Sequence, residues 1–100
     1  EVADMGIRVN CVCPSAIDDS PMLHRFTGGR DGSDTGDEGV VEGEHYKGYL
    51  DQAHVTYPMK KLTTVGEVAG TVMFLLSPAA SAITGHLLPV DGGFVVNLSR

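Results

Sequence analysis

The sequence lacks any long apolar run. A membrane-spanning helix needs about 18 consecutive, predominantly apolar residues, and no stretch of the 100 residues approaches that length. A positively charged segment followed by a short apolar one, the pattern of a secretory signal, is also missing. We therefore expect neither a membrane span nor a secretory signal in this chain.

Basic residues are scarce. The chain has 7 Lys and Arg against 13 Asp and Glu, which gives a net charge of -6. Surfaces that bind nucleic acid or anionic lipid require clustered Lys and Arg. The charge balance therefore argues against a nucleic-acid partner and against docking on a membrane.

Cysteine is also scarce, with only Cys11 and Cys13 in one apolar segment. In a strand both would point to the same face, and a disulfide between i and i+2 would be strained. We expect two small, buried, reduced side chains, which fits a cytoplasmic setting. A Cys-x-Cys metal half-site is the alternative, although no Cys/His pair follows at ligand spacing.

The segment from Gly6 to Pro14 is nearly continuously apolar and is bounded by glycine and proline. This pattern favours a strand that is covered on both faces, as in a parallel α/β sheet. Residues 1–5 resemble the end of a preceding helix that Gly6 caps. Because the chain opens with Glu1 rather than Met, we expect the N-terminus of the protein to lie upstream.

A glycine-rich, acidic stretch follows, with seven glycines between Gly28 and Gly48. Such a composition buries too little apolar surface to offset the entropy of ordering. We predict a mobile loop, either a lid that orders on ligand binding or a disordered insert, within a lid region at 18–58. Residues 40–55 have weak helical periodicity, with an apolar face made of Tyr46, Tyr49, Leu50 and Ala53.

The clearest helix is predicted at 65–76. Thr64 and Glu67 have the spacing of a capping box, and Ser77-Pro78 ends the pattern. One continuous apolar stripe is expected, formed by Val65, Val68, Ala69, Val72, Met73 and Leu76.

The last predicted strand is His86–Val90. Pro89 cannot donate to a ladder, which places this strand at a sheet edge, and residues 91–93 form a turn. A helical crossover joins the two strands, which favours parallel pairing. One such unit cannot cover both faces of the first strand, so the remaining cover is expected from upstream sequence or another chain.

Two segments resemble the short-chain dehydrogenase/reductase family. G-I-R-V-N-C-V-C-P-S-A-I-D, at 6–18, resembles the sixth strand and following loop of that family. Residues 61–93, with L-T-T-V-G-E-V-A, F-L-L-S-P-A-A-S and I-T-G-H-L-L-P-V-D-G-G, resemble its closing block. The resemblance implies an α/β, doubly wound Rossmann domain of which residues 1–100 are an incomplete C-terminal part. It also implies NAD or NADP at the carboxyl ends of the strands.

The resemblance further implies a cofactor loop after the first strand. Pro14 matches the family pattern, Ser15 stands where glycine is usual, and Ile17 takes the branched position whose backbone meets the nicotinamide carboxamide. The usual threonine position reads Asp19, with Ser20 next to it. Asp19 would repel a phosphate, whereas the Ser20 hydroxyl takes over if the loop carries one extra residue.

The family's glycine-rich motif, G-x-x-x-G-x-G, is absent, and its catalytic Tyr and Lys belong before Gly6, so we assign no catalytic residue here. Tyr57 and Lys61 have the right separation, but Pro58 biases Tyr57 away from a helix. We interpret them as a loop tyrosine and a solvated lysine. The four histidines are expected at or near the surface, namely His24, His45, His54 and His86.

Two classes of function remain open. In the first, the chain is part of an NAD(P)-dependent oxidoreductase that interconverts a small secondary alcohol and a ketone. It then supplies the nicotinamide loop, the substrate lid and a homo-oligomer interface through the last helix and edge strand. In the second, a truncated, non-catalytic chain acts as an assembly module; a fragment without function is a third alternative.

Overall fold

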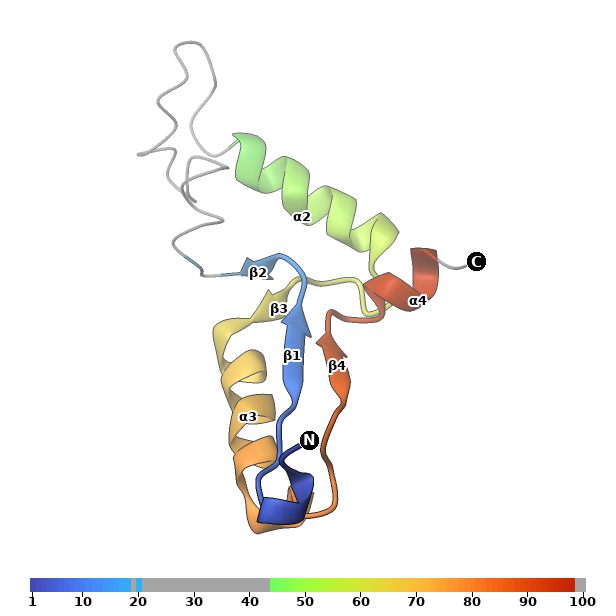
Figure 1. The fold of residues 1–100 in the computed structure, drawn as a ribbon. Helices are drawn as coiled ribbons and strands as arrows, with labels where there is room; N and C mark the ends of the chain where they lie inside the picture. The colour runs from blue at the N-terminus through green and yellow to red at the C-terminus, as the bar shows by residue number, and fades with distance from the viewer. Residues whose placement is uncertain (19, 21–43, 99–100) are drawn as a thin grey trace.

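The fold consists of two short pairs of parallel strands, with helices beside and beyond their ends (Figure 1). The structure is a computed structural model and describes residues 1–18, 20 and 44–98. The elements in chain order are η1 (Ala3–Met5), β1 (Cys11–Pro14), β2 (Ile17–Asp18), α2 (Glu44–Thr56), β3 (Thr63–Thr64), α3 (Val65–Leu76), η2 (Pro78–Ala80), β4 (Leu87–Val90) and α4 (Phe94–Leu98).

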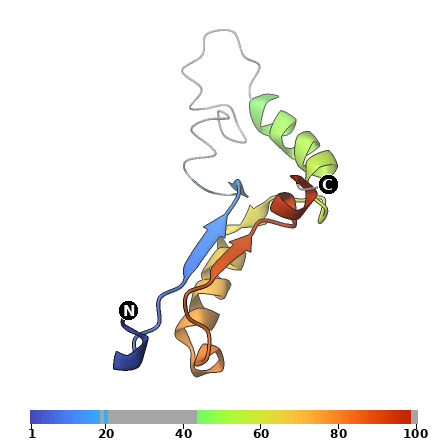
Figure 2. The ribbon, with the colours of Figure 1, turned by 45° about the vertical axis from the view of Figure 1, so that its right-hand side comes forward.

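The predicted parallel pairing of the first and last strands is confirmed. β1 pairs with β4 so that Cys11 lies opposite Leu87 and Pro14 opposite Val90. Figure 2 shows the two strands side by side with α3 along one face. Both strands point toward α2 and α4, which lie beyond their carboxyl ends (Figure 1).

The first strand is shorter than predicted, and before Cys11 side-chain hydrogen bonds join the backbone bond from Gly85 N to Val9 O, which is 2.7 Å long. The Asn10 side chain accepts a hydrogen bond from His86 N at 3.1 Å and donates one to Ile83 O at 3.0 Å. Val9 N donates to Thr84 Oγ1 at 3.1 Å. Residues 7–10 are therefore held to 83–86 without forming a regular strand.

The capping box of α3 is present as predicted. Glu67 N donates to Thr64 Oγ1 at 3.2 Å, and Thr64 N donates to Glu67 Oε2 at 2.9 Å. The helix ends at Leu76, and the backbone N–H of the capping residue Ser77 donates to Phe74 O. The predicted bounds of this helix, 65–76, agree with the structure.

Most of the predicted apolar stripe of α3 is exposed among the described residues. Leu75, which lies outside the predicted stripe, is the buried residue of α3. Met73 and Leu76 of the stripe are 66% and 71% exposed. Apolar side chains lie on nearly every side of α3. The described residues bury Leu75 and leave most of the others exposed.

The core lies at the carboxyl end of the strands rather than beneath α3. It is formed by Ala53 of α2 with Tyr57 and Leu62, and Ala16, Leu50 and Phe94 pack against it. The rings of Tyr57 and Phe94 are stacked, with centroids 5.0 Å apart. Tyr57 lies in the loop after α2, as predicted, and is also a buried core residue.

A short helix after the last strand was not predicted. The Asp91 carboxylate is buried and accepts hydrogen bonds from Gly93 N at 3.0 Å and Val95 N at 2.9 Å. It thereby caps α4, which carries Phe94 into the core. The sequence signal, an Asp three residues before an apolar run, was interpreted only as a turn.

Candidate functional site

The loop after β1 is anchored by a second parallel pair that sequence reasoning missed. Ile17 lies opposite Thr63, and Asp18 lies opposite Thr64, the residue that caps α3. Strands of two residues carry no readable periodicity. The pairing ties this loop to the start of α3, at the carboxyl ends of both β1 and β4.

Four of the five predicted cofactor residues lie together in this loop. Pro14 ends β1, Ser15 follows it, and Ile17 belongs to β2. Ser20 N donates to Ile17 O at 3.3 Å, which turns the chain after β2. Asp19 lies outside the described residues, and cofactor contact by any of the five stays a prediction.

The hydroxyl oxygen of Ser15 is the polar atom of this loop that needs a partner. Its Oγ is buried and has no hydrogen-bond partner among the described residues. A buried unpaired hydroxyl costs about 1–3 kcal/mol, so the position favours a partner that completes the site. Ser15 stands where the family usually has glycine, and the hydroxyl is a feature of this chain.

Ser15 borders a cavity of about 350 Å³ between the loop after β1, α2 and α4. It is lined by Ser15, Ala16, Gln52, Ala53, Thr56, Tyr57 and Phe94. Alanine and aromatic side chains form its apolar walls, and these residues include no charged side chain. The cavity is thus suited to a small, uncharged, mostly apolar molecule.

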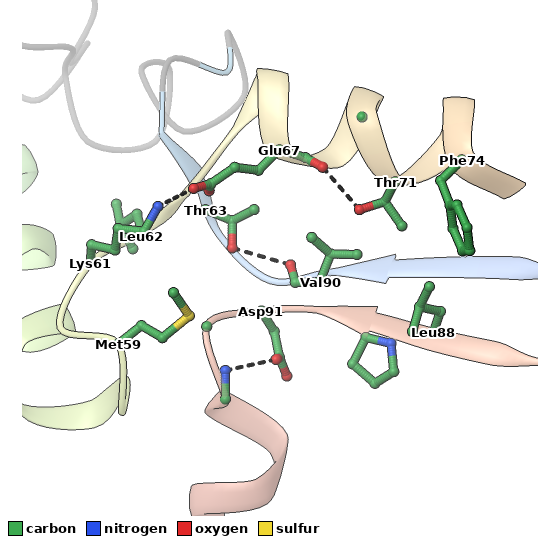
Figure 3. Close-up of a pocket in the computed structure, with 14 residues that line it drawn as sticks. Met59, Lys61, Leu62, Thr63, Glu67, Thr71, Phe74, Leu88, Val90 and Asp91 are labelled. Carbon is green, nitrogen blue, oxygen red and sulfur yellow. Dashed lines mark hydrogen bonds and ion pairs between the residues drawn. The ribbon is translucent and has the colours of Figure 1, made fainter. Parts of the chain in front are cut away.

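A second cavity, of about 690 Å³, lies between α3, β4 and the segment before α3 (Figure 3). Thr63 Oγ1 donates to Val90 O at 3.1 Å on its wall. Lys61 is exposed, as predicted for a solvated lysine, and forms an ion pair with Glu67, which also lines this cavity. That ion pair, with the hydrogen bond from Thr64 N, holds the pKa of Glu67 below its usual range.

The two cysteines do not form the buried pair that was predicted. Cys11 is exposed and Cys13 half-buried, and both are free. Their sulfur atoms lie 3.7 Å apart. The hydrogen bond with Cys11 raises the pKa of the Cys13 thiol, which disfavours a thiolate nucleophile or metal ligand.

The described part of the chain contains no group of three or more His, Cys, Asp or Glu side chains that could hold a metal ion. His54 and His86 are exposed, as expected, whereas the His24 and His45 side chains lie outside the described set. No helix within residues 44–98, or elsewhere in the described chain, is long and apolar enough to cross a bilayer.

Known proteins resemble this chain over nearly its whole length. The family model described as enoyl-(acyl carrier protein) reductase matches residues 1–95. A short-chain dehydrogenase of Hypocrea virens is 39% identical, with 88% of this chain and 28% of the relative covered. L-Xylulose reductase of Caenorhabditis elegans is 35% identical, with 97% of this chain and 32% of the relative covered. Peroxisomal 2,4-dienoyl-CoA reductase of Saccharomyces cerevisiae is 33% identical, with 93% and 26% covered.

Solved structures agree with these relatives. A C-terminal deletion mutant of aldohexose dehydrogenase from Thermoplasma acidophilum superposes with a TM-score of 0.70 at 32% identity, covering 95% of this chain and 38% of that chain. A short-chain dehydrogenase family protein of Francisella tularensis gives a TM-score of 0.66 at 28% identity, covering 95% and 36%. The chain spans about a quarter to a third of the length of the curated relatives above. With a family model over residues 1–95 and neighbours of this fold, the chain belongs to the short-chain dehydrogenase/reductase family.

Proposed function

We propose that the chain is the C-terminal part of an NAD(P)-dependent oxidoreductase that interconverts a secondary alcohol and a ketone. The observation that carries this proposal is the parallel β1–β4 pair, which presents the loop from Pro14 to Ser20 at its carboxyl end. Open α/β sheets bind dinucleotides at that end of their strands. Residues 1–100 then form one incomplete, doubly wound domain.

The residues of this loop fit the nicotinamide end of NAD or NADP. The backbone of Ile17 is positioned by its pairing with Thr63, and Ser15 holds an unpaired buried hydroxyl oxygen next to it. An amide such as the carboxamide is both donor and acceptor, so it can pair with the backbone of Ile17. The bound cofactor supplies hydride exchange with the substrate carbon. Pro14, Asp19 and Ser20 complete the proposed contact segment.

The region 18–58 is proposed as a substrate lid. Its C-terminal part is α2, which packs through Ala53 onto the core beside the loop after β1. Residues 19 and 21–43 of the lid lie outside the described set. A small alcohol or ketone would be enclosed between this region and the loop, and we propose a cytoplasmic setting because both cysteines are free.

The uncovered apolar faces support two further parts of the proposal. Cys11 and Leu87 are exposed on paired strands, as expected if further strands or helices of a larger domain cover them. Phe74 and Val72 of α3 are also partly exposed. We propose that α3 and β4 contribute to a homo-oligomer interface.

A chimera tests the function directly. The region of the C. elegans L-xylulose reductase that matches this chain is replaced by residues 1–100, and the same relative with that region deleted is the control. We expect the chimera to bind NADH or NADPH and to reduce L-xylulose or another small ketone, consuming one hydride and one proton per alcohol formed. A chimera that folds but binds neither cofactor would contradict the proposal.

The isolated chain should behave differently from the chimera. The described residues present no glycine-rich phosphate loop, so we expect no binding of NADH or NADPH by the 100-residue chain at micromolar concentration. Fluorescence titration of the reduced nicotinamide measures this. Tight binding by the isolated chain would show that residues 1–100 bind the cofactor without a glycine-rich phosphate loop.

The second candidate function is a non-catalytic assembly module. The exposed apolar side chains of α3, among them Met73 and Leu76, favour it. The chimera separates the two alternatives, because an assembly module would oligomerise with its partner without restoring cofactor binding.

A further inference from the structure

We infer that the cavity between the loop after β1, α2 and α4 holds the apolar body of a small, uncharged substrate, and that Ser15 determines its specificity. The inference rests on the proposed function and names the substrate class for it. It starts from the position of the cavity. Pro14 and Val90 are register partners at the carboxyl ends of β1 and β4, and the wall residues Ser15 and Phe94 follow them in the chain.

The walls define the shape and polarity of the occupant. Ala16 and Ala53 contribute little side-chain volume, and the stacked rings of Tyr57 and Phe94 close one side. At about 350 Å³ the cavity lies at the small end of the range for ligand pockets, roughly 300–1,000 Å³. A single ring or a short branched chain is of suitable size.

The lack of charge on the described walls favours uncharged substrates over anionic ones. The described lining residues include no Lys or Arg, so among them a phosphate or carboxylate inside the cavity would be desolvated without a charged partner. Gln52 and Thr56 supply polar groups near its edge. The cavity therefore favours an uncharged alcohol or ketone over a phosphorylated sugar or a coenzyme A thioester.

Ser15 supplies the directional contact. Its Oγ is buried without a partner in the described structure, although the residue as a whole is only half-buried. Ser15 is among the residues that line the cavity, and a change of χ1 to another staggered position is the movement that the inference requires of its hydroxyl. A hydroxyl both donates and accepts, so it recognises an alcohol or a carbonyl equally well.

The aromatic wall is held in place by contacts from three segments. Asn97 Nδ2 donates to Thr56 O at 2.7 Å, which fixes α4 against the end of α2. Met59 N donates to Gly92 O at 3.1 Å, and the buried Asp91 caps α4. The described walls of the cavity are thus formed by packed elements.

The test uses the 100-residue chain and two matched probes. 1-Phenylethanol is an uncharged secondary alcohol, and mandelate carries a carboxylate in place of its methyl group. Amide chemical-shift changes in the ¹⁵N-labelled chain locate binding. We expect 1-phenylethanol to shift the resonances of residues that line the cavity, and mandelate to leave them unchanged.

Three variants test the role of Ser15. Ser15→Ala should weaken 1-phenylethanol binding about three- to tenfold, the effect of one hydrogen bond. Ser15→Thr, which keeps a hydroxyl, should restore most of the affinity. Ser81→Ala, at an exposed position beyond α3, is the control and should bind as the wild type does.

Several outcomes would overturn the inference. They are shifts confined to other surfaces, equal binding of mandelate, unchanged affinity in Ser15→Ala, or an amide spectrum without the dispersion of a packed α2–α4 cavity. Because no cofactor is present, failure here is separate from failure of the proposed function. An active chimera with no binding in this cavity would reject the specificity role alone.

Discussion

Arg8 connects three segments that are far apart in the sequence. One guanidinium nitrogen donates to Leu75 O, in the last turn of α3, at 2.7 Å. The other donates to Ile83 O, before β4, at 3.1 Å. The two donors lie in one rigid plane, and a positive charge near the end of a helix is itself favourable.

Arg8→Lys keeps the positive charge. It removes the pair of guanidinium donors that reach two carbonyls at once, because an ammonium group has a single nitrogen. We expect the free energy of unfolding to fall by about 1–3 kcal/mol, because a carbonyl loses a charged hydrogen bond. Urea unfolding at fixed protein concentration measures it. Lys47→Met, at an exposed position on α2, is the control and should change little. An Arg8→Lys variant as stable as the wild type would show that the fork is not needed.

Glu67 makes the start of α3 sensitive to acid. The Lys61 ion pair and the Thr64 backbone hydrogen bond lower its pKa in the folded chain below the ordinary carboxyl value of 4.5. The charged carboxylate therefore stabilises the folded state above that value, and the stabilisation is lost as the pH falls through the lowered folded pKa.

The expected result is a difference in pH dependence between two chains. Between pH 6 and pH 3 the melting temperature of the wild type should fall more steeply than that of Glu67→Gln, which lacks this titration. Thermal unfolding followed by circular dichroism checks it, with Lys61→Met as a second variant that weakens the effect. Parallel curves for the wild type and Glu67→Gln would count against the assignment.

At the scale of elements, the turn between β4 and α4 depends on a glycine. Gly93 has φ of +88°, and a Cβ there would lie 2.9 Å from Cγ of Pro58. Gly93→Ala should therefore destabilise the chain by about 1–3 kcal/mol through strain and overlap. Gly70→Ala is the matched control, because Gly70 lies inside α3 with nothing within 4 Å of its added Cβ.

The two glycine variants should change stability in opposite directions. Alanine is favoured over glycine in a helix interior, so Gly70→Ala should stabilise the chain by about 0.5–1 kcal/mol. Denaturant midpoints of both variants, measured side by side, give the comparison. A Gly93→Ala chain that unfolds at the wild-type midpoint would mean that α4 does not pack on Pro58.

Elements with strong local signals were predictable from the sequence. The capping box at Thr64 fixed where α3 begins, and the parallel pairing of β1 with β4 followed from their order and the helical crossover. The loop after β1 was located correctly as the segment at the carboxyl end of a strand. These features depend on contacts that are local or on general rules of chain topology.

The features that were missed depend on tertiary contacts. The β2–β3 pair joins single dipeptides 46 residues apart in register, from Ile17 to Thr63, and no periodicity marks either. Burial of Tyr57 follows from stacking on Phe94 of α4, a helix too short to show a pattern. The buried oxygen of Ser15 is likewise visible only once α2 lies over the loop.

At the scale of the whole molecule, most of the apolar stripe of α3 is left exposed by the described residues. Met73 is 66% exposed, and burying such a side chain contributes about 1.5–3 kcal/mol. We therefore expect the 100-residue chain to sediment as a dimer or larger species at tens of micromolar. The substitution Met73→Glu should shift the chain toward the 10.5 kDa monomer. Val55→Glu, on α2 and 79% exposed, is the matched control and should leave the association unchanged. If the wild type sediments as a monomer, or if both substitutions act equally, the α3 stripe is not the contact surface, and its cover must come from elsewhere in the domain.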